Sequence, residues 1–508
     1  MKVSVLLQPG RTPVPIDSNQ LRDLGANNII LGDNTMEMEV PLTALDRIAD
    51  QVDGILLINV PSYLVPLSFQ SEGVTLTGAS QYHGLGYTGA GVKVAVIDGG
   101  FKGLSSAITN GDLRAGAIGV DCTVIDPSTG GCTTPTTFLS DEDDANGEPH
   151  GTAVAEIVYD MAPGVTLYLI KISTTLHLKL AKDYAKGQGI KIVNMSGGGV
   201  NEKFNDNSVC TVNDAYNNGI LWVNAMGNHA QRHYQATFTD NGAGWHVVQG
   251  SSIDIPITAN SGEIIDLYLT WDAWPTTTEE YDLYLVNSSG VQVASSNPGG
   301  NLPPTERIVY VAPASSTYYA RILKYSATTN RRISLYSRDH NMASSVAVAA
   351  SSLLTPADAT GAMAVGAVDQ AVWSTTKAIE SFSSQGPAND GRVKPEITGP
   401  DGVLSYTYTP NRFFGTSAAS PHVAGAAALV LSKNPIYTTS QLWSALTGSA
   451  HDTGSPGLDN TYGYGLLNLA GLGDPGDSDA DTIPDVSDLC LYYSPKTGQR
   501  IKVDCSLS

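Results

Sequence analysis

Residues 92–98 read VKVAVID, a mostly apolar run that ends in Asp98, and this run indicates the fold class of the chain. Similar runs recur downstream: VTLYLIKI at 165–172, IKIVNMS at 190–196, ILWVNAM at 220–226 and AMAVGAV at 362–368. Strands that are apolar on both faces are typical of a parallel sheet covered by helices on both sides. Helices are expected over HGTAVAEIVYDM at 150–161 and ASPHVAGAAALVLS at 419–432. We therefore predict an α/β core with a doubly wound, mostly parallel sheet.

The bulk composition restricts the classes of partner. The chain has 508 residues, which predicts about three or four domains. Its net charge of −21 argues against binding nucleic acids or anionic membranes, because phosphate groups would be repelled. No run reaches 18 apolar residues, so no transmembrane segment is expected. The opening MKVSVLLQPGRTP does not have the pattern of a signal peptide.

The first 76 residues predict a small α+β domain with the order strand, helix, strand, helix, strand. Strands are expected over KVSVLL, MEMEVPL and GILLINV, and helices over SNQLRDLGANNI, with Ser18 as its N-cap, and LTALDRIADQV. An unrelated small domain of the same pattern remains an alternative.

Residues 230–340 differ in composition and predict an antiparallel β-sandwich inserted into the α/β core. The expected strands are short, alternate with polar residues and are separated by turns such as NSSG and NPGG. They are WHVVQG, IDIPIT, IIDLYLTWDA, YDLYLVNSSG, VQVASS, RIVYVA, TYYARILKY and RISLYS.

Three side chains at the ends of expected elements can together activate a serine. Asp98 ends a buried strand, His150 opens a helix, and Ser417 opens the apolar helix of FFGTSAASPHVAG at 413–425. A carboxylate, an imidazole and a hydroxyl are the groups that make serine a nucleophile. Taken singly, each has a structural alternative: a turn-forming Asp, a surface His and a Ser N-cap. Pro421 is expected to be tolerated as part of the first helical turn.

The order Asp, His, Ser and the flanking motifs resemble the subtilisin-like serine peptidases. The resemblance is close over 80–228 and 345–470, where SFSSQGPANDGRVKPEITGPDG and HDTGSPGLDNTYGYGLLNL also match. It implies that Ser417 is the nucleophile, His150 the acid and base, and Asp98 its orienting partner, with Asn228 donating to the oxyanion. It also implies that an extended substrate pairs with two main-chain edges, which are Ser196, Gly197, Gly198 and Ala225, Met226, Gly227.

Two residues depart from the family pattern. Gly99 stands where relatives commonly have Thr or Ser, which removes a hydroxyl beside Asp98. Gly197 stands where they have a larger apolar residue, so the shape of the side pockets is not given by the resemblance.

The resemblance implies a domain order for a secreted or cell-surface serine endopeptidase made as a zymogen. The expected domains are a prodomain at 1–76, a catalytic domain at 77–229 and 341–472, an inserted sandwich at 230–340 and an Asp-rich tail at 473–508. The prodomain would assist folding, occupy the cleft and be removed by self-cleavage within 60–82. The alternative is a surface-associated binding or structural protein with a silent peptidase scaffold.

The cysteines suit an oxidising compartment. Cys122 and Cys132 bracket a short loop that favours a disulfide, and Cys490 and Cys505 bracket a second loop. Cys210 is left over and is expected to be a free thiol. Reduced thiols throughout remain an alternative.

Two acidic segments are candidates for cation binding. The tail motif DSDADTIPDVSDLC resembles a thrombospondin type 3 calcium repeat and predicts bound calcium, with the ligands Asp477, Asp479, Asp481, Asp485 and Asp488. A disordered acidic tail is the alternative. The segment SDEDDANGE is expected to be a solvated loop rather than a cation site; its acidic residues are Asp141, Glu142, Asp143, Asp144 and Glu148.

Overall fold

The computed structural model divides the chain into two compact units, residues Met1–Leu67 with Gly473–Ser508, and residues Ser68–Leu472. It describes residues 2–7, 17–31, 35–52, 55–59, 69–135, 138, 147–200, 210–297, 303–472, 491–493 and 500–502. Within those ranges, none of the helices combines the length and the hydropathy needed to cross a bilayer.

The described part of the first unit contains a four-stranded antiparallel sheet in the order β2-β3-β1-β4. Its elements are β1 (Lys2–Leu7), α1 (Ser18–Asp23), β2 (Asn27–Leu31), β3 (Thr35–Glu39), the 3-10 turn η1 (Leu42–Ala44), α2 (Leu45–Gln51) and β4 (Ile55–Asn59). A short antiparallel pair, β21 (Leu491–Tyr493) and β22 (Arg500–Lys502), belongs to the same unit.

Two expectations for this unit are wrong. The helix expected through Ile29 ends at Asp23, and Gly25, with φ of 102°, turns the chain into β2, a strand that the analysis missed. The N-cap is Asp17 rather than Ser18, because the Asp17 carboxylate accepts the Asn19 N–H at 2.8 Å.

The second unit is built on a sheet that, in its described residues, has eight strands in the order β20-β19-β10-β9-β5-β8-β6-β7. All neighbours are parallel except the edge pair β6 and β7. The strands are β5 (Lys93–Asp98), β6 (Ile118–Ile125), β7 (Cys132–Thr133), β8 (Thr166–Lys171), β9 (Ile192–Met195), β10 (Leu221–Ala225), β19 (Ala362–Asp369) and β20 (Ile397–Asp401). The α/β prediction is confirmed, although β6, β7 and β20 were not expected.

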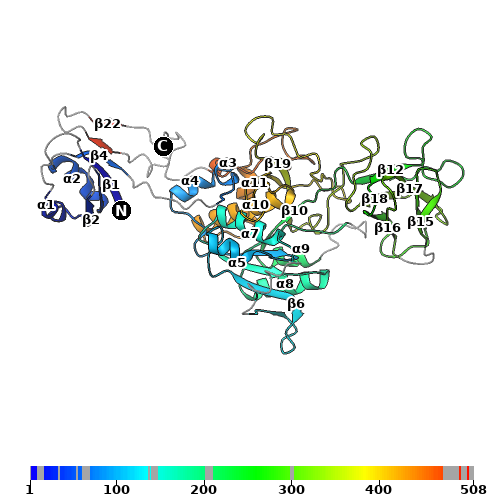
Figure 1. Ribbon diagram of the computed structural model, residues 1–508, viewed down its shortest axis with the longest axis horizontal. Coiled ribbons are helices and arrows are strands. Elements are labelled where there is room, and N and C mark those ends of the chain that lie inside the picture. The colour runs from blue at the N-terminus through cyan, green and yellow to red at the C-terminus, as the bar shows by residue number, and fades with distance from the viewer. Residues whose placement is uncertain are drawn as a thin grey trace. The chain divides into compact units, whose positions relative to one another are not determined.

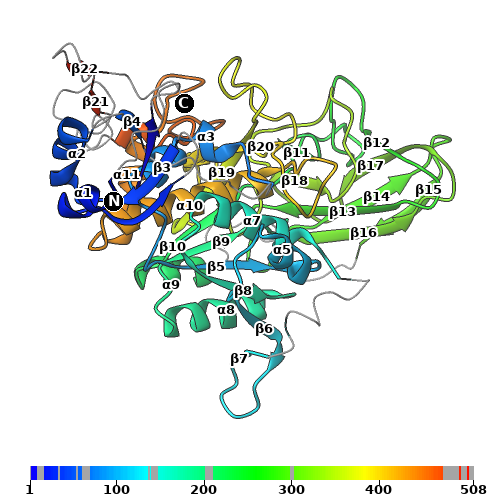
Figure 2. The ribbon, with the colours of Figure 1, turned by 60° about the vertical axis from the view of Figure 1, so that its left-hand side comes forward.

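Helices cover both faces of this sheet (Figure 2). Val94 and Val96 of β5 belong to a buried cluster with α7 (His150–Met161) and α10 (Thr416–Lys433). Ala95 and Ile97 point to the opposite face and pack with α8 (Thr175–Gly187) and α9 (Cys210–Asn217). The remaining helices are α3 (Gly73–Leu76), α4 (Ala79–Gly84), α5 (Leu104–Asn110), α11 (Thr439–Gly448) and the turn η2 (Ala470–Leu472).

Residues 230–340, which we call the two-sheet segment, form two antiparallel sheets drawn in green in Figure 1. In its described residues the sheet orders are β11-β18-β13-β16 and β12-β17-β14-β15, and one buried hydrophobic cluster joins them. The strands are β11 (His233–Thr237), β12 (Ile255–Ala259), β13 (Ile264–Trp271), β14 (Tyr281–Val286), β15 (Gln292–Ser296), β16 (Thr305–Val311), β17 (Ser316–Lys324) and β18 (Arg332–Ser337). The expected strand WHVVQG forms only isolated bridges, and β11 supplies a strand in its place.

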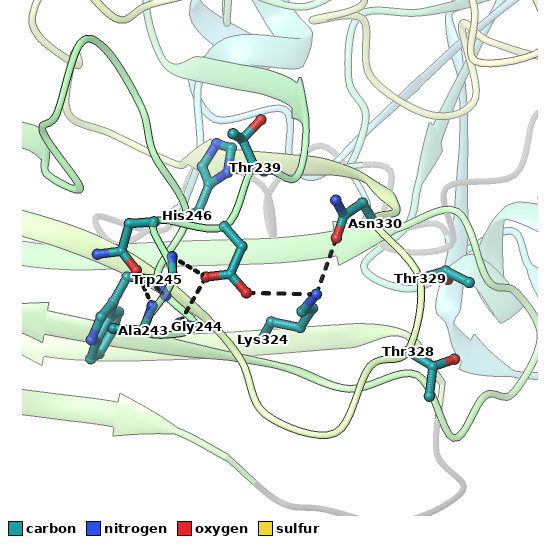
Figure 3. Close-up of polar contacts among 12 residues, drawn as sticks. Thr239, Ala243, Gly244, Trp245, His246, Lys324, Thr328, Thr329 and Asn330 are labelled. Carbon is teal, nitrogen blue, oxygen red and sulfur yellow. Dashed lines mark hydrogen bonds and ion pairs between the residues drawn. The ribbon is translucent and has the colours of Figure 1, made fainter.

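Polar contacts near Gly244 and Lys324 hold the turn that follows β11 (Figure 3), and the group they share is the carboxylate of Asp240. This carboxylate accepts the N–H groups of Gly242 and Gly244, both at 2.8 Å, and these bonds lower the pKa of Asp240. Lys324 Nζ lies 3.7 Å from the same carboxylate and donates to Asn330 at 3.2 Å. The contacts fix the conformation of a long turn that is rich in glycine.

Cys122 and Cys132 form a disulfide that joins β6 to β7. Cys210, at the start of α9, is an exposed free thiol. The expected second pair, Cys490 and Cys505, lies outside the described residues.

The boundary between the two units falls nine residues before the expected one at 76. Residues 69–72 are held by the second unit through polar contacts: Phe69 N donates to Asp112 at 2.8 Å, and Ser71 N donates to Asp160 at 2.7 Å. The Ser71 hydroxyl also lies 2.6 Å from Nε2 of the buried His422. These bonds explain why this segment belongs with the larger unit.

The two helices α7 and α10 pack at very short distance. A Cβ added to Gly425 of α10 would lie 2.3 Å from Met161 Cβ of α7, so no larger residue fits without moving one helix. Gly187 of α8, in contrast, has open space around it among the described residues.

Replacing Gly425 by alanine should therefore destabilise the second unit by about 1–3 kcal/mol, the usual cost of overpacking. The matched change Gly187→Ala should raise stability by up to about 1 kcal/mol, because alanine restricts the unfolded chain more than glycine. Differential scanning calorimetry of both full-length variants measures the two shifts. Equal melting temperatures for the two variants would contradict the packing argument.

Candidate active site

Polar side chains gather at the edge of the sheet where the parallel strands end. Asp98 is the last residue of β5, Ser196 directly follows β9, and Asn228 lies three residues after β10. His150 is the first residue of α7, and Ser417 is the second residue of α10. This edge is where functional groups collect in open α/β sheets.

Asp98 and His150 form a direct pair. His150 Nδ1 lies 2.8 Å from Asp98 Oδ2, and Asp98 Oδ1 accepts the Gly99 N–H at 2.7 Å. The main chain thus supplies a hydrogen bond to the carboxylate although Gly99 brings no hydroxyl. Gly151 allows this approach, since a Cβ there would lie 2.7 Å from Asp98 Cβ and 2.4 Å from the Gly100 carbonyl oxygen. The Asp98 side chain is 8% exposed and the His150 side chain is 24% exposed.

The surroundings of His150 favour its protonated form. Burial opposes the charge, but the hydrogen bond and the charge of Asp98, together with the charge of Glu148, outweigh it and raise the pKa of His150. The imidazole is therefore a better base than a free histidine, with its tautomer fixed by Asp98.

The Ser417 hydroxyl donates to the Ser196 carbonyl at 3.0 Å. No hydrogen bond joins Ser417 and His150, both of which the structure describes. Phe413, four residues before Ser417, packs edge-on against the imidazole, with ring centroids 5.6 Å apart. Of the three expected catalytic residues, the structure thus joins Asp98 and His150 directly and leaves Ser417 bonded to the neighbouring edge strand.

Pro421 is the sixth residue of α10, so the expectation that it lies in the first turn is wrong. Because proline has no N–H, the Ser417 carbonyl loses its intrahelical partner. The Ser196 hydroxyl replaces that partner at 2.8 Å. Asn194 holds Ser196 by donating to its hydroxyl at 3.0 Å, and Asn194 in turn accepts from Ser420 at 2.7 Å.

Asn228 is fixed in one orientation by the turn before Ser417. Its Oδ1 accepts both the N–H and the hydroxyl of Thr416, each at 3.0 Å. This leaves the Nδ2 amide as a donor at the cavity that Asn228 and Ser417 line together. A Cβ at Gly415, where φ is 113°, would lie 3.0 Å from this Nδ2. The lack of a side chain at Gly415 therefore leaves room for the Nδ2 group of Asn228.

Asp401 is a residue of this site that the sequence analysis missed. Its Oδ2 accepts the Gly415 N–H at 2.8 Å, which ties the turn before Ser417 to the end of β20. Burial, with the charges of Glu380 and Asp369, raises the pKa of Asp401 to about 8. The only signal for it was a single acid within the otherwise uncharged stretch ITGPDG.

Two cavities adjoin at Ser196 and Gly197. The first, of about 320 Å³, contains Asp98 and His150, and the second, of about 440 Å³, contains Ser417 and Asn228.

Five of the six expected substrate-strand residues line the second cavity: Ser196, Gly197, Gly198, Ala225 and Gly227. Met226 does not. It is fully buried, its N–H donates to the Val365 carbonyl, and its own carbonyl accepts from Leu354 N. Its main-chain groups are therefore not open to an added strand.

The acidic residues of both segments, the expected calcium ligands of the tail and the expected solvated loop before His150, lie largely outside the described residues. This holds for the tail residues Asp477, Asp479, Asp481, Asp485 and Asp488, and for Asp141, Glu142, Asp143 and Asp144. Glu148 is described and exposed, and it accepts the His150 N–H at 3.2 Å. In the described part of the chain, no group of three or more His, Cys, Asp or Glu residues is arranged to hold a metal.

Removing the charge of Asp98 should lower the pKa of His150. In the Asp98→Asn variant, burial is opposed only by the charge of Glu148, so the pKa should fall from above 6.5 to below it. Titration of the His150 ring protons by NMR measures the shift. The Glu148→Gln variant is the control and should move the pKa less. An unchanged pKa in Asp98→Asn would contradict the pairing.

Comparison with known proteins agrees with this geometry. The Subtilase family model, Peptidase_S8, matches residues 89–344 and 287–465. The thermostable alkaline protease of Halalkalibacterium halodurans is 43% identical over 116 residues, which are 22% of this chain and 28% of that protein. Subtilisin BL of Lederbergia lenta is 42% identical over 122 residues, 23% of this chain and 40% of that protein.

The aligned region thus spans well under half the length of these curated relatives. Among solved structures, the Clostridium perfringens CspB protease covers 79% of this chain and 98% of its own, with a TM-score of 0.56 and 16% identity, a likeness of fold alone. Since the family model spans most of the chain, from residue 89 to residue 465, the chain belongs to the subtilase family.

Proposed function

We propose that the protein is a serine endopeptidase that hydrolyses peptide bonds of proteins through an acyl-enzyme. The observation that carries the proposal is the pair of Asp98 and His150 at the same sheet edge as Ser417 and Asn228. Membership of the subtilase family supports it. The presence of all four of these side chains argues against the alternative, a binding or structural protein whose peptidase domain is inactive.

The mechanism assigns each proton to a named atom. The Ser417 hydroxyl leaves the Ser196 carbonyl by rotating its side chain, and His150 Nε2 takes its proton while Oγ bonds to the substrate carbonyl carbon. Asn228 Nδ2 and the first N–H groups of α10 stabilise the oxyanion. His150 then gives the proton to the leaving amine as the peptide C–N bond breaks. A water molecule gives a proton to His150 Nε2 and bonds to the acyl carbon; the bond from that carbon to Ser417 Oγ breaks, and Oγ takes the proton back as the acid product leaves.

The variant Ser417→Ala should lose at least about 10⁴-fold in kcat on an unfolded protein substrate, because the nucleophile is absent. It should also lose labelling by a fluorophosphonate. Ser444→Ala, an exposed serine of α11, is the control and should retain both properties. Hydrolysis by Ser417→Ala at the native rate would remove the assignment.

We propose further that the first unit is a prodomain that is cut from the rest just before Phe69. The Phe69 nitrogen already lies 2.8 Å from the Asp112 carboxylate. Burial raises the pKa values of Asp112, Glu156 and Asp160, and no cation among the described residues pairs with them. Cleavage of the peptide bond before Phe69 would turn its amide into an ammonium group, which offsets this buried negative charge.

Mass spectrometry of the active protein should therefore find Phe69 as the first residue of the processed chain, while the Ser417→Ala chain stays uncut. In the processed form Asp112→Asn should lower the melting temperature, because the ammonium loses its partner. In the uncut Ser417→Ala background the same change should have a smaller effect. Active protein that still begins at Met1, or that begins after Ser71, would contradict the proposal.

Three further properties remain proposals. The disulfide between Cys122 and Cys132 supports a location outside the cytosol, secreted or at the cell surface. The two packed sheets support an inserted accessory β-sandwich. The spacing of aspartates in the tail supports a structural calcium site there.

A further inference from the structure

The cavity beside Ser417 has a wall that comes from the two-sheet segment. Its lining includes Arg232, Tyr268, Arg338 and Asp339, together with Ser417 on the opposite element. Tyr268 lies on β13, and the other three lie in the loops directly before β11 and after β18 of this segment, which is drawn in green in Figure 1.

The charges of this wall are not balanced. Asp266 is engaged by Arg307, which donates two hydrogen bonds to its carboxylate at 3.0 and 2.9 Å. Arg338 lies farther from its nearest carboxylates, 3.7 Å from Asp266 and 3.9 Å from Asp339, and its side chain is 64% exposed. Its guanidinium group therefore keeps donors for an added carboxylate.

The Arg232 side chain is held by the loop that follows β18, which contains Arg338 and Asn341. Its guanidinium donates to the Arg338 carbonyl at 3.1 Å and to the Asn341 side chain at 3.2 Å. Among the described residues no carboxylate forms an ion pair with it. Within the described residues, Arg232 thus has no paired carboxylate, and Arg338 has only the long ion pairs with Asp266 and Asp339.

The remaining lining residues do not cancel this positive charge. Asp339 is the single carboxylate among the described residues that line the cavity. Burial, with the charges of Arg232 and His233, lowers the pKa of His229 to about 4, so His229 is neutral at pH 7. A net positive cavity is notable on a chain of net charge −21.

We propose that Arg338 and Arg232 determine specificity, and that the cavity binds an acidic side chain, preferably glutamate, of the residue whose carbonyl Ser417 attacks. The inference rests on the proposed peptidase function and names its substrate class. Self-cleavage before Phe69, where Ser68 precedes the cut bond, is intramolecular and therefore does not depend on this preference for separate substrates. Ser417 and the two arginines line one continuous cavity of about 440 Å³, so a side chain entering beside Ser417 meets the guanidinium groups. Glutamate reaches farther than aspartate and can accept from both groups.

The test compares peptides that differ only in the residue before the cleaved bond, which is Glu, Gln or Leu. For the wild type, kcat/KM should be about 10- to 100-fold higher for Glu than for its isostere Gln, the range expected for hydrogen bonds to a charged group. In Arg338→Met the ratio of Glu to Gln should fall at least about fivefold, and in the double variant with Arg232→Met it should approach one. Arg338→Lys should keep part of the preference.

The matched control is Lys324→Met, which removes a positive charge from the same segment at the turn shown in Figure 3. Lys324 is not among the residues that line the cavity. It should leave the ratio unchanged. The rate of fluorophosphonate labelling should be similar in all variants, which shows that Ser417 remains reactive. Equal rates for Glu and Gln in the wild type, or an unchanged ratio in Arg338→Met, would overturn the inference. Loss of labelling and of all hydrolysis in the wild type would instead refute the peptidase function.

Discussion

The close packing of α10 on α7 is the constraint on which the site depends. Each helix carries one of the proposed catalytic side chains at its first turn, His150 on α7 and Ser417 on α10, so their separation follows from the helix contact. Gly425 and Met161 make that contact so short that no side chain separates the helices. The central sheet then fixes Asp98 and Asn228 relative to both, because β5 and β10 are buried between two helical layers.

A second set of bonds links the reacting side chain to the strand beside it. Pro421 frees the Ser417 carbonyl, and the Ser196 hydroxyl takes its place, while Ser417 Oγ donates to the Ser196 carbonyl. Each serine therefore donates its hydroxyl to the carbonyl of the other, and Asn194 donates to the Ser196 hydroxyl. A disturbance at Ser196 would move Ser417, the proposed nucleophile, as well as the proposed edge for substrate pairing. Binding and chemistry are in this way mechanically coupled.

Prediction from the sequence works best for elements whose pattern is local. Five buried strands and the helices α7 and α10 follow from apolar runs, and Asp98, His150 and Ser417 follow from motifs of a few residues. Prediction failed where local signals compete. The helical pattern expected from Ser18 continues into β2, and the positive φ of Gly25, which the pattern does not show, marks where the chain changes direction. Prediction also missed Asp401, and no motif connects Arg338 with Ser417. Such neighbours depend on how distant segments fold together, which periodicity and spacing do not encode.

The two-sheet segment leaves and re-enters the core at adjoining points. Met342 N donates to the Gln231 carbonyl at 2.9 Å, and Val348 N donates to the His233 carbonyl at 2.8 Å, so its two ends lie side by side. A segment closed in this manner adds little strain to the scaffold, whatever its length. Exchange of the whole segment between related enzymes could thus change which polypeptides are recognised without moving a single reacting atom. The segment could therefore be exchanged as one unit, in evolution or by protein engineering.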